Sequence, residues 1–271
     1  MNVLVFDIET VPDTKAGRLL HRLEGLSDTE TANAMSLLQR EKAGHDFLPA
    51  HLQKIIAISV VLRTQHKVAV WSLGTLEDDE KDLITRFYDG INSYSPMLIS
   101  WNGSGFDLPV LHYRSLIHRV AAARYWENGS HDMQFRYNNY LNRYHERHTD
   151  LMDVFAAYQS RCYAPLDEIA KLLGLPGKMG MHSNDVWAAY QANQLSEIRH
   201  YCQVDVLNTY LVYLHYQFIR GKLSDSALAT EAQLLHDTLV KEAHPHLLAF
   251  VQAWKQESFS ALTTIEPKTS K

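Results

Sequence analysis

Several short stretches of the chain are rich in β-branched and aromatic residues and apolar on both faces, a pattern typical of strands buried within a sheet. They are Val3–Ile8, Ile55–Leu62, Lys67–Trp71 and Met97–Trp101, and Thr149–Val154 predicts a last short strand. Because these stretches span four to eight residues and end at polar or turn-forming positions, they favour strands over buried helices.

Apolar residues recur with helical spacing through much of the remaining chain. The predicted helices are Lys15–Leu23, Asp28–Arg40, Asp79–Asn92, Leu108–Ala123, Leu166–Leu173, Asn184–Gln191, Leu195–Arg220 and Thr230–Gln256. Strands with interleaved helices come first and helices dominate afterwards. This order predicts an α/β fold with a central mixed five-stranded sheet flanked by helices.

The same pattern predicts how the chain is divided. We expect one domain over residues 1–225, with helical or irregular excursions at 13–53 and 112–148. A C-terminal helical extension and tail should occupy 226–271, and the last residues, Ile265–Lys271, are expected to fray.

Composition narrows the class of protein. The 271 residues are 46% hydrophobic and 21% charged, which is enough for a sizeable core, and the net charge of −5 excludes a generally basic nucleic-acid coat. Two cysteines are too few for a disulfide framework or a Cys-based zinc site. Because no window approaches a membrane span and the N-terminus has the pattern of a core strand, we expect a cytoplasmic protein without membrane contact.

Two acids end the first apolar strand, in the sequence FDIET. Asp7 and Glu9 are two residues apart, so in a strand they point to the same side of the sheet, about 7 Å apart along it. Like charges in a half-buried place destabilise each other unless something positive lies nearby. Alone, this pair is equally consistent with solvated acids at a strand-loop junction.

Two further segments carry candidate acids. In NGSGFDLPVL, Asp107 follows a buried strand and a glycine-containing turn, and it is also well suited to cap the helix that begins there. In YCQVD, Tyr201 and Asp205 share one helix face beside an apolar stripe, where an unpaired acid would be costly. A core tyrosine beside a solvated aspartate is the alternative.

The four carboxylates of Asp7, Glu9, Asp107 and Asp205 come from three separate elements. Oxygen ligands without a cysteine cluster favour two divalent cations, Mg²⁺ or Mn²⁺. On this interpretation, divalent cations rather than Lys or Arg stabilise Asp7 and Glu9. Two such ions suit in-line attack on a phosphodiester.

In this order the segments FDIETVPD, NGSGFDLPVL and YCQVD resemble the three motifs of the DEDD superfamily of 3'-5' exonucleases, in its tyrosine branch. The chain is most similar to predicted exonucleases related to the proofreading domain of family B DNA polymerases, over most of residues 1–220. The resemblance implies a ribonuclease H-like fold. It also implies that Asp7 bridges both metal ions and that Glu9 and Asp205 hold the ion that carries the nucleophile. Asp107 would serve the second ion, and Tyr201 would orient the attacking water.

Other residues are candidates for contact with the substrate backbone or bases, and each has a structural alternative. Asn102 either bonds a phosphate or shapes its loop, and Lys178, in a glycine-rich loop, either touches substrate or is simply solvated. Thr10 and Phe106 adjoin the motif acids and are expected to contact substrate.

The stretch 112–148 is rich in Arg and Tyr. There Arg136 and Arg143, with Arg114 and Arg147, either grip phosphates or belong to a solvated excursion whose tyrosines pack inward. In HTDLMDVF, Asp150 and Asp153 are interpreted as structural caps or as groups behind the site.

These patterns predict a metal-dependent 3'-5' exonuclease that releases 5'-mononucleotides from single-stranded ends, with DNA slightly favoured. The alternatives are an RNA-trimming exoribonuclease, a non-catalytic nucleic-acid-binding module, and a two-metal phosphatase, which the lack of His ligands disfavours. The partner is expected to be a nucleic acid with a free 3' end. No polymerase domain accompanies the motifs, so proofreading in cis is not expected, and the oligomeric state is left open.

Overall fold

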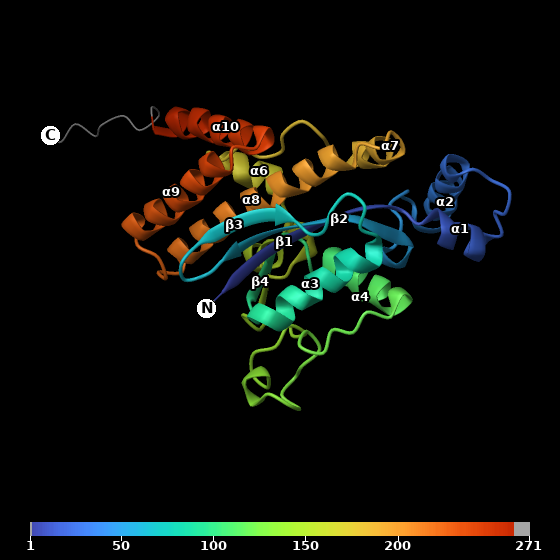
Figure 1. Cartoon of the computed structure of the whole chain (residues 1–271), viewed down its shortest axis with the longest axis horizontal. Helices are drawn as coiled ribbons and strands as arrows, with labels where there is room; N and C mark the ends of the chain where they lie inside the picture. The colour runs from blue at the N-terminus through green and yellow to red at the C-terminus, as the bar shows by residue number, and fades with distance from the viewer. Residues whose placement is uncertain (1, 263–271) are drawn as a thin grey trace.

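A computed structural model describes residues 2–262 of the chain, with side chains for residues 2–254. Within that range five strands form one sheet, in the order β3-β2-β1-β4-β5. Their bounds are β1 (Val3–Pro12), β2 (Gln53–Arg63), β3 (Val68–Ser72), β4 (Met97–Ser100) and β5 (His148–Asp150). β1 pairs antiparallel with β2 and parallel with β4, so the sheet is mixed (Figure 1). The predicted α/β fold with a central five-stranded mixed sheet is confirmed.

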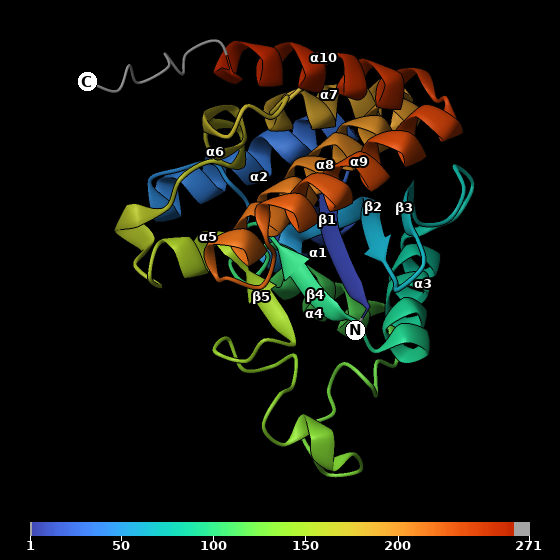
Figure 2. The same ribbon diagram turned by 90° about the vertical axis from the view of Figure 1, so that its left-hand side faces the viewer.

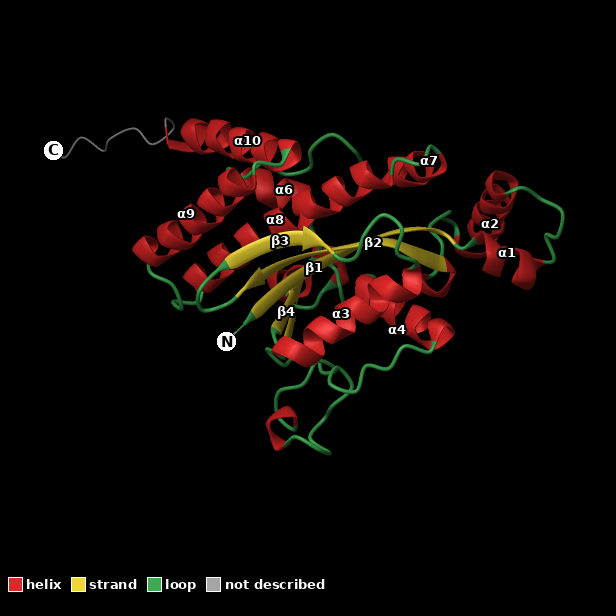
Figure 3. Ribbon diagram, viewed as in Figure 1, coloured by secondary structure: helices red, strands yellow, loops and turns green. Residues whose placement is uncertain are grey.

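Helices cover both faces of this sheet (Figures 1 and 3). On one face lie α6 (Leu166–Leu172), α8 (Leu195–Ile219), α9 (Asp225–Glu242) and α10 (Pro245–Leu262). On the other lie α3 (Glu80–Tyr94) and α4 (Asp107–His118). The remaining helices are α1 (Thr14–His21), α2 (Asp28–Ala43), α5 (Leu151–Phe155) and α7 (Val186–Gln191). Seen from the side, α8 runs directly over β1 (Figure 2).

The central strand β1 is buried on both faces because its apolar residues alternate between two cores. Val3 and Val5 pack in the core under α8, whereas Leu4, Phe6 and Ile8 pack in the core formed with α3 and α4. Since side chains alternate along a strand, the next odd-numbered residues are directed to the α8 side. This alternation determines the direction of the acids that follow Phe6.

The pairing of β1 with β2 changes register between Glu9 and Thr10. Glu9 pairs with Ala57 and Thr10 pairs with Ile55, so Ile56 is the extra residue of a β-bulge. A bulge locally increases twist and redirects side chains. Here it lies beside one of the candidate site acids.

Several predicted element bounds are wrong, and the first strand continues past Ile8 to Pro12, so Asp7 and Glu9 lie within it. The last strand ends at Asp150, because its carboxylate accepts the backbone N–H of Met152 and starts α5. The helix predicted over Thr230–Gln256 is two helices, broken where Ala243 has φ of 56° and Pro245 begins α10. The helix after β4 ends at His118 rather than Ala123, with Arg119 in the left-handed region.

The division of the chain at residue 225 stays a prediction. Leu235, Leu239 and Phe250 of α9 and α10 share one core with Val5 of β1. The tail Ile265–Lys271 lies outside the described residues. Among residues 2–262, no helix has the length and hydropathy required to cross a membrane.

Candidate active site

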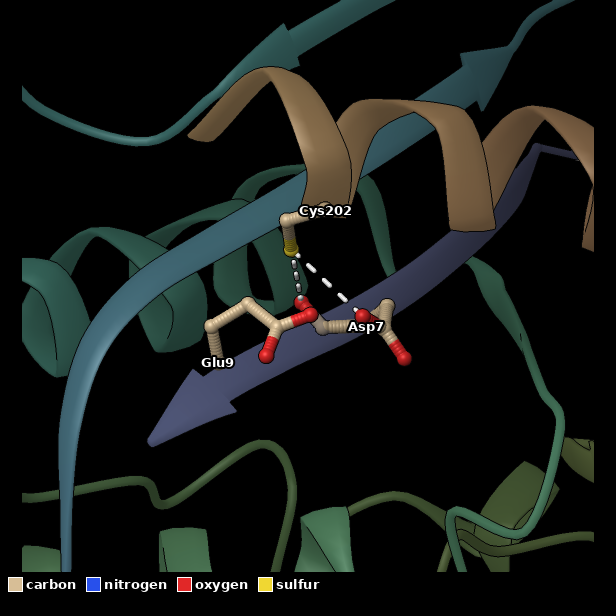
Figure 4. Close-up of side chains that lie close together, drawn as sticks. All are labelled: Asp7, Glu9 and Cys202. Atoms are coloured by element: carbon tan, nitrogen blue, oxygen red, sulfur yellow. Dashed lines mark hydrogen bonds between the residues drawn. The ribbon is translucent and has the colours of Figure 1, made fainter. Parts of the chain in front are cut away.

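Asp7 and Glu9 both face α8, as the alternation along β1 requires. Figure 4 shows both side chains beneath Cys202 of α8, whose Sγ lies 3.5 Å from the main-chain oxygen and from Oδ2 of Asp7. One potential ligand atom from each of these three residues lies within 4.8 Å of the others. Asp7 is half-buried and Glu9 is buried.

Asp107 reaches β1 from the beginning of α4. Its Oδ1 accepts the backbone N–H of Ile8 at 3.1 Å, so this carboxylate lies against the backbone between the other two acids. The simple capping alternative does not describe it, because the cap position of α4 is Phe106, without a side-chain capping bond. Burial, with smaller effects from the charges of Asp150 and Asp205, raises the pKa of Asp107 to about 7, although the hydrogen bond from Ile8 acts to lower it.

Tyr201 and Asp205 come from successive turns of α8 and are both buried. Oδ1 of Asp205 is buried without a hydrogen-bond partner. The pKa of Asp205 is raised to about 6, because the effect of burial exceeds the lowering effects of the Lys178 charge and the Tyr201 hydroxyl. Burial, followed by the charge of Asp205, raises the pKa of Tyr201, so its hydroxyl is protonated at neutral pH.

We call Asp7, Glu9, Asp107 and Asp205 the acidic site. Burial is the largest cause of the raised pKa of Asp7, followed by the charges of Asp107 and Glu9. Burial and the charge of Asp205 likewise raise the pKa of Glu9. Four mutually repelling carboxylates and one unpartnered buried oxygen are what oxygen-coordinated divalent cations require, so the residues fit such ions.

Lys178 supplies positive charge to the acidic site, which the sequence interpretation did not expect. Its Nζ lies 2.7 Å from the hydroxyl of Tyr201, and its charge lowers the pKa of both Glu9 and Asp205. The prediction that neither Lys nor Arg stabilises Asp7 and Glu9 is therefore wrong for Glu9. One lysine does not balance four carboxylates, so an excess of negative charge remains.

The turn before Asp107 is held by a second acid. Asp150 accepts the backbone N–H groups of Asn102 and Ser104, at 2.9 and 2.8 Å, and also caps α5. A Cβ at Gly105 would lie 2.4 Å from Oδ1 of Asn102, so any larger residue there would displace the Asn102 side chain. The interpretation of Asp150 as a structural cap is confirmed, and the backbone of Asn102 shapes its loop.

The remaining substrate candidates lie in different surroundings. Thr10 donates a hydrogen bond to Gln53, and half-buried Phe106 lies directly before Asp107. Arg136 is exposed, whereas the guanidinium of Arg143 pairs with Asp153 at 2.9 Å. Both arginines belong to the excursion that hangs below α3 and α4 in Figure 1.

Two other arginines of this stretch are buried and bonded within the protein. Arg147 donates to the main-chain oxygen of Asn138 and lies over the ring of Phe135, at 4.0 Å from its centroid. Arg114 pairs with Asp13 and Glu80. These two arginines are therefore structural and do not face a substrate.

Cys202 is the residue beside the acids that sequence reasoning missed. It lies in YCQVD itself, one residue after Tyr201, and a helical-wheel count would have directed it toward β1. Its residue type alone suggests a zinc or disulfide role, which two cysteines are too few to support. Its pKa is raised, first by burial and then by the charges of Asp7 and Glu9, so it stays a neutral thiol.

Comparison with known proteins points to one family. A family described as a predicted 3'-5' exonuclease related to the exonuclease domain of PolB matches residues 45–254. Asp107, Tyr201 and Asp205 lie within the matched residues, and Asp7 and Glu9 precede them. No curated protein matches the chain.

Among solved structures, the chain is similar to the family B DNA polymerase from the hyperthermophilic archaeon Pyrobaculum calidifontis. The two are 16% identical with a TM-score of 0.46, over 78% of this chain and 24% of the polymerase. The chain thus matches about a quarter of that protein's length.

Proposed function

Because the chain belongs to the family of predicted 3'-5' exonucleases related to the exonuclease domain of PolB, we propose that it removes nucleotides from single-stranded 3' ends, with DNA slightly favoured over RNA. The reaction would hydrolyse the terminal phosphodiester and release 5'-mononucleotides. It would depend on two divalent cations, Mg²⁺ or Mn²⁺.

The observation that carries this proposal is the acidic site itself. Carboxylates from β1, α4 and α8 converge with raised pKa values, and Oδ1 of Asp205 is buried without a partner. Such a cluster is costly for folding unless a ligand of opposite charge compensates it. The acidic site would hold the two cations. When bound, they supply charge neutralisation at the phosphate and lower the pKa of a water.

The protein's own groups would orient the reactants. Tyr201 is protonated and its hydroxyl oxygen lies 2.7 Å from the Lys178 ammonium, which donates to it. The hydroxyl hydrogen of Tyr201, which stabilises the Asp205 carboxylate, would bond a water or a phosphate oxygen beside Asp205 when substrate is present. Lys178 would fix that hydroxyl and attract the substrate backbone, a role that rests on its position between Tyr201, Glu9 and Asp205.

The direct test uses 5'-labelled single-stranded DNA and RNA of the same sequence, incubated with Mg²⁺, Mn²⁺ or EDTA. We expect a ladder that shortens from the 3' end with either cation and no cleavage in EDTA. Comparison of the two ladders gives the sugar preference, and an RNA-only ladder would establish the exoribonuclease alternative. Binding without cleavage under all cation conditions would leave only the nucleic-acid-binding module.

A further inference from the structure

Asn208 is a buried polar residue of α8 that lies on the same face of the helix as Tyr201 and Asp205. It follows Asp205 by three residues and Tyr201 by seven, a spacing that places the three side chains along one stripe. Only 1% of its surface is exposed. Because a buried carboxamide is costly unless its polar atoms are bonded, the partners of Asn208 indicate its role.

The Asn208 carboxamide bonds Gly177, which lies in the loop between α6 and the short 3-10 helix η4 (Ser183–Asp185). Its Oδ1 accepts the backbone N–H of Gly177 at 3.1 Å, and its Nδ2 donates to the main-chain oxygen of the same residue at 2.8 Å. Nδ2 also donates to the main-chain oxygen of Val204, at 3.0 Å. Both Nδ2 hydrogens are thus used within the protein, so Asn208 holds this loop rather than a substrate.

Asp167 of α6 bonds the same loop one residue later. Its Oδ1 accepts the backbone N–H of Lys178 at 2.7 Å, and its Oδ2 pairs with Lys171 at 2.7 Å. Gly177 has φ of 67°, in the left-handed region, and a Cβ there would lie 2.5 Å from Oδ1 of Asp167. Asn208 and Asp167 therefore bond adjacent residues of a loop whose backbone at this point favours glycine.

The residue that these bonds place is Lys178. It is half-buried, and its Nζ lies 2.7 Å from the hydroxyl of Tyr201. Because a lysine side chain is long and flexible, keeping its ammonium on one hydroxyl requires that its backbone be fixed. The bonds to Gly177 and to the Lys178 N–H supply that fixed backbone.

We propose that Asn208 and Asp167 are positioning residues for cleavage, which hold the loop so that the Lys178 ammonium stays on the Tyr201 hydroxyl. This inference rests on the proposed function for the reaction that Lys178 and Tyr201 serve. The three hydrogen bonds of Asn208 reach none of the carboxylates of the acidic site, so Asn208 acts through Lys178. Its loss should slow cleavage and leave cation binding by the acidic site unchanged.

The test is a double-mutant cycle of Asn208→Leu and Lys178→Met, measured by single-turnover cleavage of a 5'-labelled oligothymidylate with saturating Mn²⁺. Each single variant should cut about tenfold more slowly than the wild type, within the range for a misplaced reacting group. The double variant should cut no more slowly than Lys178→Met alone, because the two residues act as one unit. Wild-type rates for Asn208→Leu, or a double variant whose loss is the product of the two single losses, would overturn the inference.

Asp167→Ala keeps the test valid if Asn208→Leu fails to fold, because the side chain of Asp167 is 26% exposed. It should also cut about tenfold more slowly, and add nothing to Lys178→Met. Lys171→Met is the matched control, since it removes the ion pair of Asp167 and keeps the bond to the Lys178 N–H, so it should cut like the wild type. Equal rates for Asp167→Ala and Lys171→Met would contradict the role of Asp167.

Hydrogen exchange in EDTA gives a readout that needs no cleavage. Asn208→Leu should speed exchange of the amides of residues 176–181 and leave those of β1 as slow as in the wild type, whereas Lys178→Met should leave both unchanged. Equal exchange of residues 176–181 in Asn208→Leu and wild type would overturn the inference. Wild-type protein that cuts no oligonucleotide would refute the exonuclease, and faster exchange in Asn208→Leu would then still show that Asn208 holds the loop of Lys178.

Discussion

Two clusters of buried acids lie near β1, and they differ in how their charge is compensated. In the ion-pair network of Asp13, Glu80, Arg114 and His118, the Arg114 guanidinium donates to Asp13 at 2.5 Å and to both oxygens of Glu80. Glu80 also accepts the backbone N–H of Ile55 at 2.6 Å, and His118 lies 2.7 Å from it. Arg114 is only 3% exposed.

The acidic site has comparable burial and one nearby lysine. Its carboxylates have raised pKa values, and one oxygen of Asp205 has no partner. In the ion-pair network, compensated buried charges hold structural elements together. In the acidic site, buried charges without full compensation indicate that a ligand binds there.

The largest effect should come from Asp7→Asn. We expect it to abolish cleavage, because it removes a carboxylate proposed to hold both cations, and to leave the fold intact in EDTA, because it relieves repulsion. A nuclease assay beside thermal melting measures both, with exposed Asp89→Asn as control. A variant that cuts normally, or that is grossly unfolded, would contradict the assignment.

The opposite result is expected in the ion-pair network. Arg114→Met leaves Glu80 and Asp13 buried without their counter-charge, so it should lower the free energy of unfolding by about 3–5 kcal/mol. Cleavage per folded molecule should stay near the wild-type value. Urea unfolding checks this, with exposed Arg119→Met as the matched variant. If Arg114→Met were stable and inactive, the ion-pair network would have a role in cleavage rather than in stability.

The pH dependence of stability sharpens the comparison. Because the folded-state pKa of Asp107 is raised to about 7, its contribution to stability is complete below pH 4 and lost as pH rises through 7. In EDTA, the free energy of unfolding of Asp107→Asn should rise relative to that of the wild type as pH increases from 4 to 7. At about 1.4 kcal/mol per pKa unit, the rise is at most about 4 kcal/mol.

Urea unfolding at pH 4.5, 6 and 8 measures the difference for Asp107→Asn. Burial lowers the pKa of His148 and His246 to about 4, so these histidines add stability as pH rises. Both are present in the variant and in the wild type, so their contributions cancel in the difference. A constant difference across these pH values would mean that Asp107 ionises without penalty.

Tyr201→Phe should slow cleavage about 10²-fold, or about 2.7 kcal/mol, because it deletes only the hydroxyl that orients a reactant. Affinity for metal should stay nearly constant. Single-turnover kinetics beside metal titration separates the two. Tyr190→Phe is a close control, since its hydroxyl also meets a lysine, Lys54 at 3.3 Å, away from the acidic site. Equal cleavage rates for Tyr201→Phe and Tyr190→Phe would show that Tyr201 is a core residue without a role in cleavage.

The sheet could be predicted from the sequence, and the four acids could be singled out, because both depend on short apolar stretches of the chain. Val3–Ile8 is apolar on both faces, which marks a central strand, and each site acid follows or faces such an apolar run. Helix ends were less predictable. The break at Ala243 depends on a backbone conformation that alanine rarely adopts, and only Pro245 hints at it.

Long-range contacts could not be predicted in this way. Arg114 meets partners 101 and 34 residues away, so no spacing rule identifies the ion-pair network. Lys178 lies in a glycine-rich loop without periodicity, and its approach to Tyr201 depends on how that loop packs on α8.

The central claim is that the acidic site binds divalent cations, and calorimetric titration of the metal-free protein with Mn²⁺ at pH 8 tests it most directly. The account predicts that wild type binds Mn²⁺ with a stoichiometry approaching two, as a pair of cations requires. Asp7→Asn should lose most of this binding, while Arg114→Met, titrated under conditions where it is folded, should retain it. Wild-type protein without measurable binding, or with binding that Asp7→Asn leaves unchanged, would contradict the account.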